Sequence, residues 1–266
     1  MFLKPKTIHL HFGLEKPVKI LHLTDVHFSL ADEEDGEDLM KHAASRRNTF
    51  FQEAGCPERD PVGFLEDAME YAKDFDCTVI TGDILDFMSH ANYEAAHRIL
   101  AGKDYMFCAG NHEFCPKVGV PDSFARKEEK TDEVQSVFRG NMFFESRIVG
   151  GVNIITADNG YYTWTEEQYE MLRREVAKGY PIAIFCHVPL NCNVLDHNPH
   201  HKDLWAPDEV VATTRKVTKY IVDEPLIKGI FAGHWHSNGE YLLSSGKTCY
   251  VTGGLFKGIV GEIVID

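Results

Sequence analysis

Five apolar stretches of this chain end in side chains that bind metal ions or transfer protons. The stretches are VKILHLTDVH (18–27), CTVITGD (77–83), YMFCAGNHE (105–113), IAIFCHVP (182–189) and IKGIFAGHWH (227–236). The polar side chains at or just beyond their carboxyl ends are Asp25, His27, Asp83, Asp86, Asn111, His112, Glu113, His187, His234 and His236. One such motif alone is weak, because histidine is common in structural roles. Five in succession predict one site, and imidazole with carboxylate suits manganese, iron or zinc.

The last stretch contains two histidines separated by one residue, His234 and His236. In an extended chain, residues two apart point the same way. If the strand ends at Gly233, both imidazoles project from its carboxyl end. We therefore expect the pair to act as ligands rather than as ordinary loop histidines.

Seven of the side chains at these strand ends can hold two metal ions if one carboxylate bridges the ions. Asp83 is the natural bridge, because Gly82 before it allows a tight backbone turn at the strand end. Two divalent ions about 3.5 to 4 Å apart can orient a phosphoryl group and stabilise an in-line displacement.

The elements that must position these side chains are strands alternating with helices. Periodic apolar residues predict helices over 62–75, 91–102 and 165–176, the last with capping-box spacing between Thr165 and Gln168. Alternating strands and helices indicate a parallel sheet, whose ligand site lies at the carboxyl ends of its strands.

The C-terminal part of the chain has a different pattern. The stretches 240–254 and 259–266 are typical of antiparallel hairpin strands, which predicts a second, more antiparallel sheet. The N-terminal stretch 1–13 predicts an edge strand, and 114–146 predicts helix and loop over one edge. The expected fold is α/β, a layered α/β/β/α sandwich of two mixed sheets flanked by helices, in one domain over residues 1–266.

Composition and charge exclude several functions. The 266 residues are 44% apolar and 26% charged, as in ordinary globular proteins. A formal net charge of -14 disfavours a partner that is a nucleic acid polymer. No apolar run approaches the roughly 20 residues of a membrane span, and the N-terminus does not resemble a signal peptide, so we expect a cytoplasmic protein.

The seven cysteines contain no C-x-x-C spacing. Four of them lie inside strand-like runs and are expected to be small buried hydrophobic residues; they are Cys77, Cys108, Cys186 and Cys249. A metal site built from thiolates is therefore not expected.

The order of the motifs resembles the calcineurin-like metallophosphoesterase superfamily. The matching motifs are Asp25-x-His27, Gly82-Asp83-x-x-Asp86, Gly110-Asn111-His112-Glu113, His187 and Gly233-His234-x-His236. The resemblance implies one ion held by Asp25, His27, Asp83 and His236. It implies a second ion held by Asp83, Asn111, His187 and His234. Their combination is specific for a dinuclear phosphoesterase but not for its substrate.

The resemblance also implies catalytic roles. His112 would stabilise the phosphoryl oxygens and protonate the leaving group, and Asp86 would hydrogen-bond that imidazole. Glu113 is expected to support the site or cap a helix. Attack on phosphorus by a metal-bound hydroxide, without a phosphoenzyme, is expected because no cysteine or serine stands at a nucleophile's place in the motifs.

Differences from the better-known branches of this superfamily narrow the range of possible substrates. Phosphoprotein phosphatases carry arginines where this chain has Phe87 and Ala109, so the bidentate grip on phosphate is missing there. Purple acid phosphatases place a tyrosine ligand where this chain has Asp86. We expect a small phosphorylated substrate, a nucleotide or a phosphodiester, with a slight preference for the diester. The alternatives are a phosphomonoesterase, a non-catalytic metal-binding scaffold and, least favoured, a nuclease.

Three further segments attract attention. The acidic segment 31–38 is expected to be a solvated loop, and Arg46, Arg47 and Asn48 could reach the substrate as a lid. In the stretch 158–164, Tyr161, Tyr162 and Trp164 are expected to pack in the core or cover the sheet, rather than stack on a base.

The stretch 195–205 contains His197, His200, His201 and Lys202. A surface loop is the expected structure, and a rim that contacts the substrate is the alternative.

Overall fold

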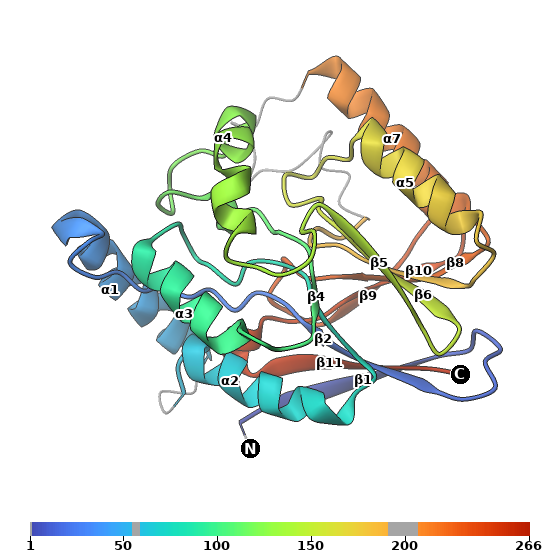
Figure 1. Cartoon of the computed structure of the whole chain (residues 1–266), viewed down its shortest axis with the longest axis horizontal. Coiled ribbons are helices and arrows are strands. Elements are labelled where there is room, and N and C mark those ends of the chain that lie inside the picture. The colour runs from blue at the N-terminus through green and yellow to red at the C-terminus, as the bar shows by residue number, and fades with distance from the viewer. Residues whose placement is uncertain (1, 55–58, 191–206) are drawn as a thin grey trace.

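The computed structural model describes residues 2–54, 59–190 and 207–266 (Figure 1). One sheet has the strand order β1–β11–β2–β3–β4. Its strands are β1 (Lys4–Leu10), β11 (Ile259–Ile265), β2 (Val18–Leu23), β3 (Cys77–Ile80) and β4 (Met106–Phe107). The strands β2, β3 and β4 run parallel, whereas β11 runs antiparallel to β2 and parallel to β1.

The other sheet has the strand order β5–β6–β7–β8–β10–β9. Its strands are β5 (Phe144–Val149), β6 (Val152–Ala157), β7 (Ile182–Phe185), β8 (Ile227–Ala232), β10 (Thr248–Val251) and β9 (Gly239–Leu242). The four inner strands run parallel, and each edge strand runs antiparallel to its neighbour.

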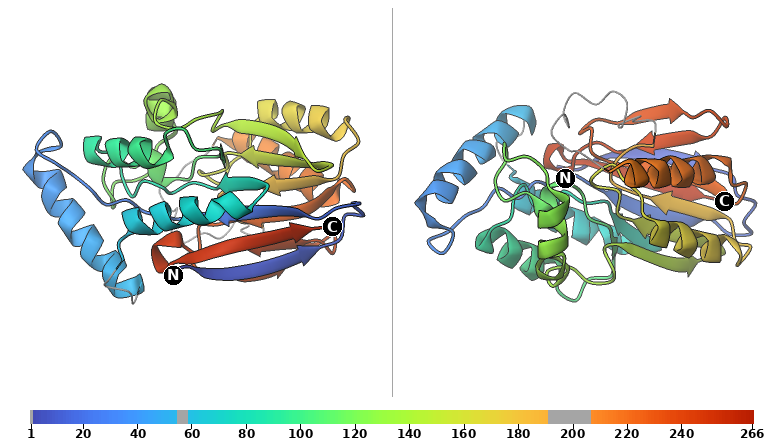
Figure 2. Two further views of the ribbon diagram at one scale, coloured as in Figure 1. Left: turned by 60° about the horizontal axis from the view of Figure 1, so that its bottom comes forward. Right: turned by 90° about the horizontal axis from the view of Figure 1, so that it is seen from above.

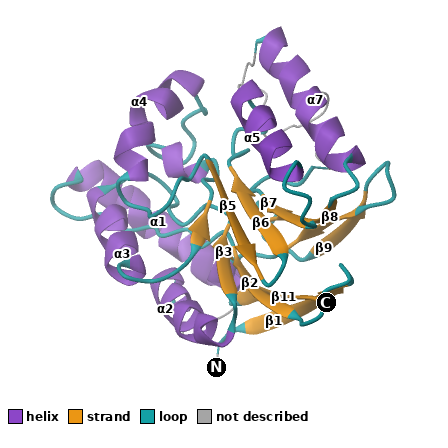
Figure 3. Cartoon of the chain, turned by 45° about the vertical axis from the view of Figure 1, so that its right-hand side comes forward, coloured by secondary structure: helices purple, strands orange, loops and turns teal. Residues whose placement is uncertain are grey.

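Helices cover the outer faces of both sheets (Figures 2 and 3). The helices α2 (Pro61–Tyr71) and α3 (His90–Leu100) pack on the first sheet, and α5 (Glu166–Val176) and α7 (Asp208–Asp223) pack on the second. The other helices among the described residues are α1 (Gly36–Ala54) and α4 (Phe124–Gln135), with short 3-10 turns η1 (Ala72–Asp74), η2 (His112–Phe114) and η4 (Leu255–Lys257).

Between the two sheets lies a third apolar layer. Side chains from both sheets meet there, among them Ile20, Val79, Ile154, Phe185 and Phe231. Alternate residues of β2 face opposite ways: Ile20 joins this middle layer, while Leu21 and Leu23 pack toward the helices. The predicted α/β/β/α layering of two mixed sheets is confirmed.

The C-terminal strands correct the prediction of a more antiparallel second sheet. The hairpin of β9 and β10 is present, but β10 joins β8 in parallel, and β11 lies in the first sheet instead. The reason is burial: Ile263 and Ile265 of β11 fill the layer between the sheets, and Val260 packs toward the helices. A strand with both faces covered fits the middle of a sheet and not an exposed hairpin.

Several local predictions are confirmed. Helices occupy the three predicted ranges, Thr165 and Gln168 form the capping box, and β1 is an edge strand. The four cysteines expected to be buried are buried. Among the described residues, no helix is long and apolar enough to cross a bilayer.

The acidic segment 31–38 is more structured than a solvated loop. Its last residues begin α1, and two of its carboxylates hold the start of α3. Asp35 accepts a hydrogen bond from the His90 backbone N–H at 2.7 Å, and Asp32 lies 2.8 Å from His90 Nδ1. Carboxylates at a helix N-terminus are favourable, because the unpaired N–H groups there carry partial positive charge.

Candidate metal centre

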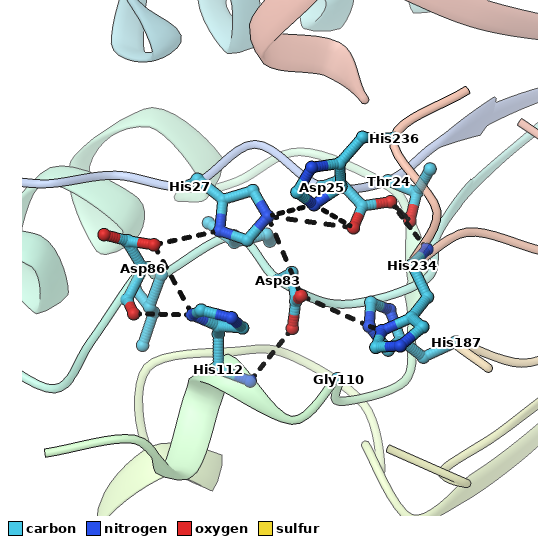
Figure 4. Close-up of polar contacts among 12 residues, drawn as sticks. Thr24, Asp25, His27, Asp83, Asp86, Gly110, His112, His187, His234 and His236 are labelled. Atoms are coloured by element: carbon cyan, nitrogen blue, oxygen red, sulfur yellow. Dashed lines mark hydrogen bonds and ion pairs between the residues drawn. The ribbon is translucent and has the colours of Figure 1, made fainter. Parts of the chain in front are cut away.

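The five motif-bearing strands end at the same place. Asp25 and His27 follow β2, Asp83 follows β3, and His112 follows β4, all in the first sheet. The second sheet contributes His187 after β7 and the two histidines of GHWH after β8. Figure 4 shows these side chains turned toward one another across the junction of the two sheets.

The backbone at these positions is unusual. Non-glycine residues with positive φ among those described are Asp25, His27, Asp83, Tyr162, His234 and His236. Five of these six are predicted ligands. A side chain in the left-handed region costs of order 1–3 kcal/mol and persists where the surroundings impose it, which is typical of functional sites.

The first ligand group consists of Asp25, His27 and His236. His27 Nε2 lies 3.0 Å from His236 Nε2. Asp25 Oδ1 lies 3.7 Å from His27 Nε2 and 3.4 Å from His236 Nε2. The three donor atoms thus face a common point.

The second ligand group consists of Asp83, His187 and His234. His187 Nε2 lies 3.1 Å from His234 Nδ1 and 3.2 Å from Asp83 Oδ2. The same Asp83 oxygen lies 3.7 Å from His27 Nε2 of the first group. Asp83 Oδ2 therefore stands between the two groups, in the position predicted for a bridge.

Hydrogen bonds to the outer ring nitrogens aim the inner nitrogens at these points. His187 Nδ1 donates to the Thr81 carbonyl at 2.7 Å, and His27 Nδ1 lies 3.2 Å from Asp86 Oδ1. Each Nε2 is then left as a lone pair directed at another imidazole. Two lone pairs about 3 Å apart repel unless a cation or proton lies between them.

Two buried side-chain oxygens at this site have no hydrogen-bond partner in the described part of the chain and could bind a metal ion. Asp25 Oδ2 accepts from Thr24 Oγ at 2.8 Å and from the His234 N–H at 2.9 Å. Among the described residues, Asp25 Oδ1 and Asn111 Oδ1 are buried without a hydrogen-bond partner. Buried polar atoms are rarely left so, and an ion is one of the partners that explain them.

The electrostatics of the two groups match a cation site. Burial opposes ionisation of Asp25, but the adjacent imidazoles of His236 and His27 outweigh it and hold the pKa of Asp25 well below its usual range. Burial likewise opposes protonation of His27 and His187. Carboxylates nevertheless raise the pKa of His27 to about 10, and Asp83 raises the pKa of His187 to about 9.

These residues fit two divalent ions. Ligands bound at 2.0 to 2.2 Å around one ion stand roughly 3 to 3.4 Å from each other. The inner nitrogens and oxygens lie 3.0 to 3.7 Å apart. Oxygen and imidazole donors suit manganese, iron or zinc, and the structure does not select one of them.

Backbone contacts hold the loop that carries Asp83. Gly82 has a φ of +77°, and a Cβ there would lie 2.1 Å from Gly110 N, so the β3 and β4 loops touch only because both residues are glycine. The buried Glu113 carboxylate accepts the Asp83, Ile84 and Gly110 N–H groups at 2.7 to 2.8 Å. Glu113 thus has the supporting role expected for it.

His112 lies at the open side of the site. Its side chain is 20% exposed, and its backbone N–H donates to Asp83 Oδ1 at 3.0 Å. The expected link to Asp86 is present, but its shorter contact is to the main chain: His112 Nδ1 lies 2.7 Å from the Asp86 carbonyl and 3.4 Å from Asp86 Oδ1. His112 Nε2 is left as the nitrogen that can reach a substrate.

The Asp86 carboxylate is held mainly by Arg46 of α1. Arg46 Nε and Nη2 donate to its two oxygens at 2.7 and 2.9 Å, and Ser29 Oγ donates at 3.1 Å. The Arg46 guanidinium also lies over Phe50, which stacks on the His27 ring at 4.9 Å. The sequence suggested that Arg46 could reach the substrate as a lid. Its guanidinium instead pairs with Asp86, which contacts the candidate ligand His27.

Tyr161, Tyr162 and Trp164 are all buried, as expected. The sequence did not predict the further contact of Tyr162, whose hydroxyl lies 2.5 Å from His234 Nε2. The alternating pattern of Asn-Gly-Tyr-Tyr gives no sign of which ring faces the histidine. The predictions for 195–205, including His197, His200, His201 and Lys202, lie outside the described residues.

A comparison with known protein families shows the family to which this chain belongs. The profile of the calcineurin-like phosphoesterases matches residues 18–238, which include all the motifs described above. The chain belongs to the calcineurin-like phosphoesterase family. It is a metallophosphoesterase, a hydrolase of phosphoester bonds, in a family that depends on two metal ions. No curated protein matches the sequence.

Solved structures similar to this calcineurin-like phosphoesterase are found at low sequence identity. A purple acid phosphatase from yellow lupin (Lupinus luteus) seeds is 15% identical with a TM-score of 0.50, covering 93% of this chain and 45% of that one. A putative 5'-nucleotidase from Staphylococcus aureus is 13% identical with a TM-score of 0.50, covering 94% and 51%. A dimetal phosphatase from Danio rerio is 16% identical with a TM-score of 0.49, covering 90% and 88%. The chain spans about half of the first two proteins.

Proposed function

We propose that this calcineurin-like phosphoesterase uses two divalent ions to hydrolyse a small phosphorylated substrate, with a slight preference for phosphodiesters. The observation that carries the proposal is the position of Asp83 Oδ2, 3.2 Å from His187 Nε2 and 3.7 Å from His27 Nε2. One carboxylate oxygen close to both ligand groups fits a bridge between two ions.

Within the proposal, each residue has a defined role. The first ion is held by Asp25, His27, Asp83 and His236, and the second by Asp83, Asn111, His187 and His234. When bound, two such ions polarise the phosphoryl oxygens and lower the pKa of an attacking water.

His112 protonates the leaving-group oxygen from Nε2. Its Nδ1 proton is fixed on the Asp86 carbonyl at 2.7 Å, so Nε2 is the atom that delivers the proton. Asp86 holds both His112 and His27 in place.

The preference for a diester rests on the missing arginines. Phe87 and Ala109 are fully buried in the apolar core, so neither position offers a donor to a phosphate dianion. Arg46 lies near the site, but its guanidinium donates two hydrogen bonds to the Asp86 carboxylate. A phosphodiester carries one negative charge fewer than a monoester and needs less of such neutralisation. A phosphomonoester, such as a nucleotide, is the alternative.

The test compares hydrolysis of bis-p-nitrophenyl phosphate with that of p-nitrophenyl phosphate by the manganese-reconstituted protein. Asp83→Ala and His112→Ala serve as controls. Faster diester turnover, lost in Asp83→Ala and reduced in His112→Ala, is the expected result. Faster monoester turnover would favour the alternative substrate. No hydrolysis of either ester or of a panel of nucleotide esters, with two ions bound, would overturn the proposed activity.

A further inference from the structure

Tyr162 contacts the second ligand group through His234. Its hydroxyl lies 2.5 Å from His234 Nε2, and the two rings meet edge to face at 90° with centroids 5.2 Å apart. We propose that Tyr162 is a positioning residue that holds His234 with Nδ1 directed at the second ion. This inference rests on the proposed function, because it concerns how one of the two ions is bound.

The choice of nitrogen follows from the geometry on the inner side of His234. His234 Nδ1 lies 3.1 Å from His187 Nε2, which in turn lies 3.2 Å from Asp83 Oδ2. Nδ1 is thus the nitrogen that faces the ion. A neutral imidazole that binds through Nδ1 carries its proton on Nε2, and this N–H donates to the Tyr162 oxygen.

The partner of the outer nitrogen decides how well such a ligand is prepared. Ligating histidines almost always donate their other N–H to an acceptor, which fixes the tautomer and the ring orientation. Here the acceptor is a phenol on a neighbouring loop. Without that oxygen, the His234 proton can move to Nδ1, where it blocks the lone pair that the ion needs.

The backbone independently connects Tyr162 with the ligands. Tyr162 has a φ of +60°, and the other described non-glycine residues with positive φ are five of the proposed ligands. For a bulky side chain this conformation is a genuine outlier. With this backbone conformation, the Tyr162 ring lies edge to face against His234.

The loop before Tyr162 is fixed to both neighbouring ligand loops. The Tyr162 N–H donates to the Asn159 carbonyl at 2.7 Å. The Asn159 side chain accepts from Val188 N and donates to Val188 O, each at 2.8 Å, directly beside His187.

Gly160, which follows Asn159, fixes the loop to the second ligand loop. A Cβ on Gly160 would lie 2.5 Å from the Gly110 carbonyl carbon, so this loop packs directly on the backbone that precedes Asn111. Asp158 adds an ion pair with Lys127 of α4 at 2.6 Å. Tyr162 is therefore held in place before any ion binds.

The adjacent tyrosine provides a matched control. Tyr161 is fully buried and packs on Phe114 and Phe124, at ring centroid distances of 6.2 and 5.7 Å. Tyr161→Phe and Tyr162→Phe each remove one hydroxyl from neighbouring positions of the same loop. Only the second removes a contact to a proposed ligand.

The experiment measures manganese binding to the chelator-stripped full-length protein by calorimetric titration. The wild type and Tyr161→Phe should bind two ions with the same affinities. Tyr162→Phe should weaken one ion by about 10- to 100-fold and leave the other unchanged. Equal weakening by Tyr161→Phe, or unchanged affinities in Tyr162→Phe, would overturn the role of Tyr162. A wild type that binds fewer than two ions would overturn the proposed function instead.

Histidine ring signals of the zinc-loaded, ¹⁵N-labelled protein give a second readout that does not depend on activity. The His234 ring, identified by the signal lost in His234→Asn, should carry its proton on Nε2 in the wild type. In Tyr162→Phe the Nε2 proton should exchange faster with water or be lost. An identical His234 spectrum in both proteins would contradict the proposal.

Discussion

The two ligand groups differ in what lies behind their histidines. In the first group, His27 is backed by the Asp86 carboxylate, which Arg46 holds in a two-pronged ion pair. In the second, His187 donates to the neutral Thr81 carbonyl and His234 meets the Tyr162 phenol. One group is supported by charge and the other by neutral oxygens.

The difference predicts unequal affinities for the two ions. An ionised carboxylate behind an imidazole raises its basicity more than a carbonyl does. Burial opposes protonation of His27, but Asp25 and, behind the ring, Asp86 raise its pKa to about 10. We expect the ion of the first group to be retained longer when a chelator is added.

Replacing the shared carboxylate should abolish the distinction between the groups. Asp83→Asn removes the charge that both ions share, so both affinities should fall together. Because the ions supply several kcal/mol of transition-state stabilisation, kcat/KM should drop by about 10³-fold or more. Steady-state kinetics and metal analysis on the same sample check this. Loss of one ion alone would show that Asp83 belongs to a single group.

Replacing His112 should reduce the rate without disturbing either group. A general acid contributes about 10²- to 10⁴-fold, so His112→Asn should lower kcat by that amount while both ions stay bound. The loss should be smaller for an ester with a p-nitrophenolate leaving group, which needs no proton, than for an alkyl ester. An equal loss for both esters would remove His112 from the role of acid.

Removing the charge behind the first group should weaken that group alone. Arg46→Met keeps the packing on Phe50 but removes the fork that holds Asp86. The affinity of the first ion should fall by about 10- to 100-fold. A chelator should then remove the first ion as fast as the second, or faster. Arg47→Met, one residue along the same helix, is the control and should change neither affinity in the titration.

The strand ends and the candidate ligands that follow them could be predicted from the sequence because the chemistry is local. A residue such as Asp83 directly follows an apolar run, and parallel strands bring their carboxyl ends together. The position of β11 could not be predicted, because its alternating pattern fits either sheet and long-range burial decides between them. Tyr162 could not be distinguished from Tyr161, since the positive φ of Tyr162, which places its ring against His234, leaves no mark in the sequence.

His22 is a buried histidine that is not a candidate ligand, so its protonation can be measured separately from that of the metal centre. It lies fully buried below the second group, where its two nitrogens contact Thr81 Oγ and Thr252 Oγ, each at 2.8 Å. Burial lowers the pKa of His22 to about 3, from 6.5. His22 is therefore a neutral imidazole, unlike the carboxylate-paired His27.

The sign of its effect on stability follows from proton uptake. Below pH 6.5 the unfolded chain protonates His22 and the folded chain does not until about pH 3, so stability falls as the pH falls through this range. At 1.36 kcal/mol per unit, the loss attributable to His22 between pH 6.5 and 5 approaches about 2 kcal/mol. His22→Gln keeps polar contacts to both threonines but has no such titration.

The measurement is urea unfolding of both proteins at pH 7 and pH 5 in the presence of a chelator. The wild type should lose about 2 kcal/mol more than His22→Gln between the two conditions. The other histidines titrate equally in both proteins and cancel in the difference. Equal losses of unfolding free energy in the two proteins would mean that His22 is protonated in the folded chain. A positive charge would then lie outside the two ligand groups as well as within them.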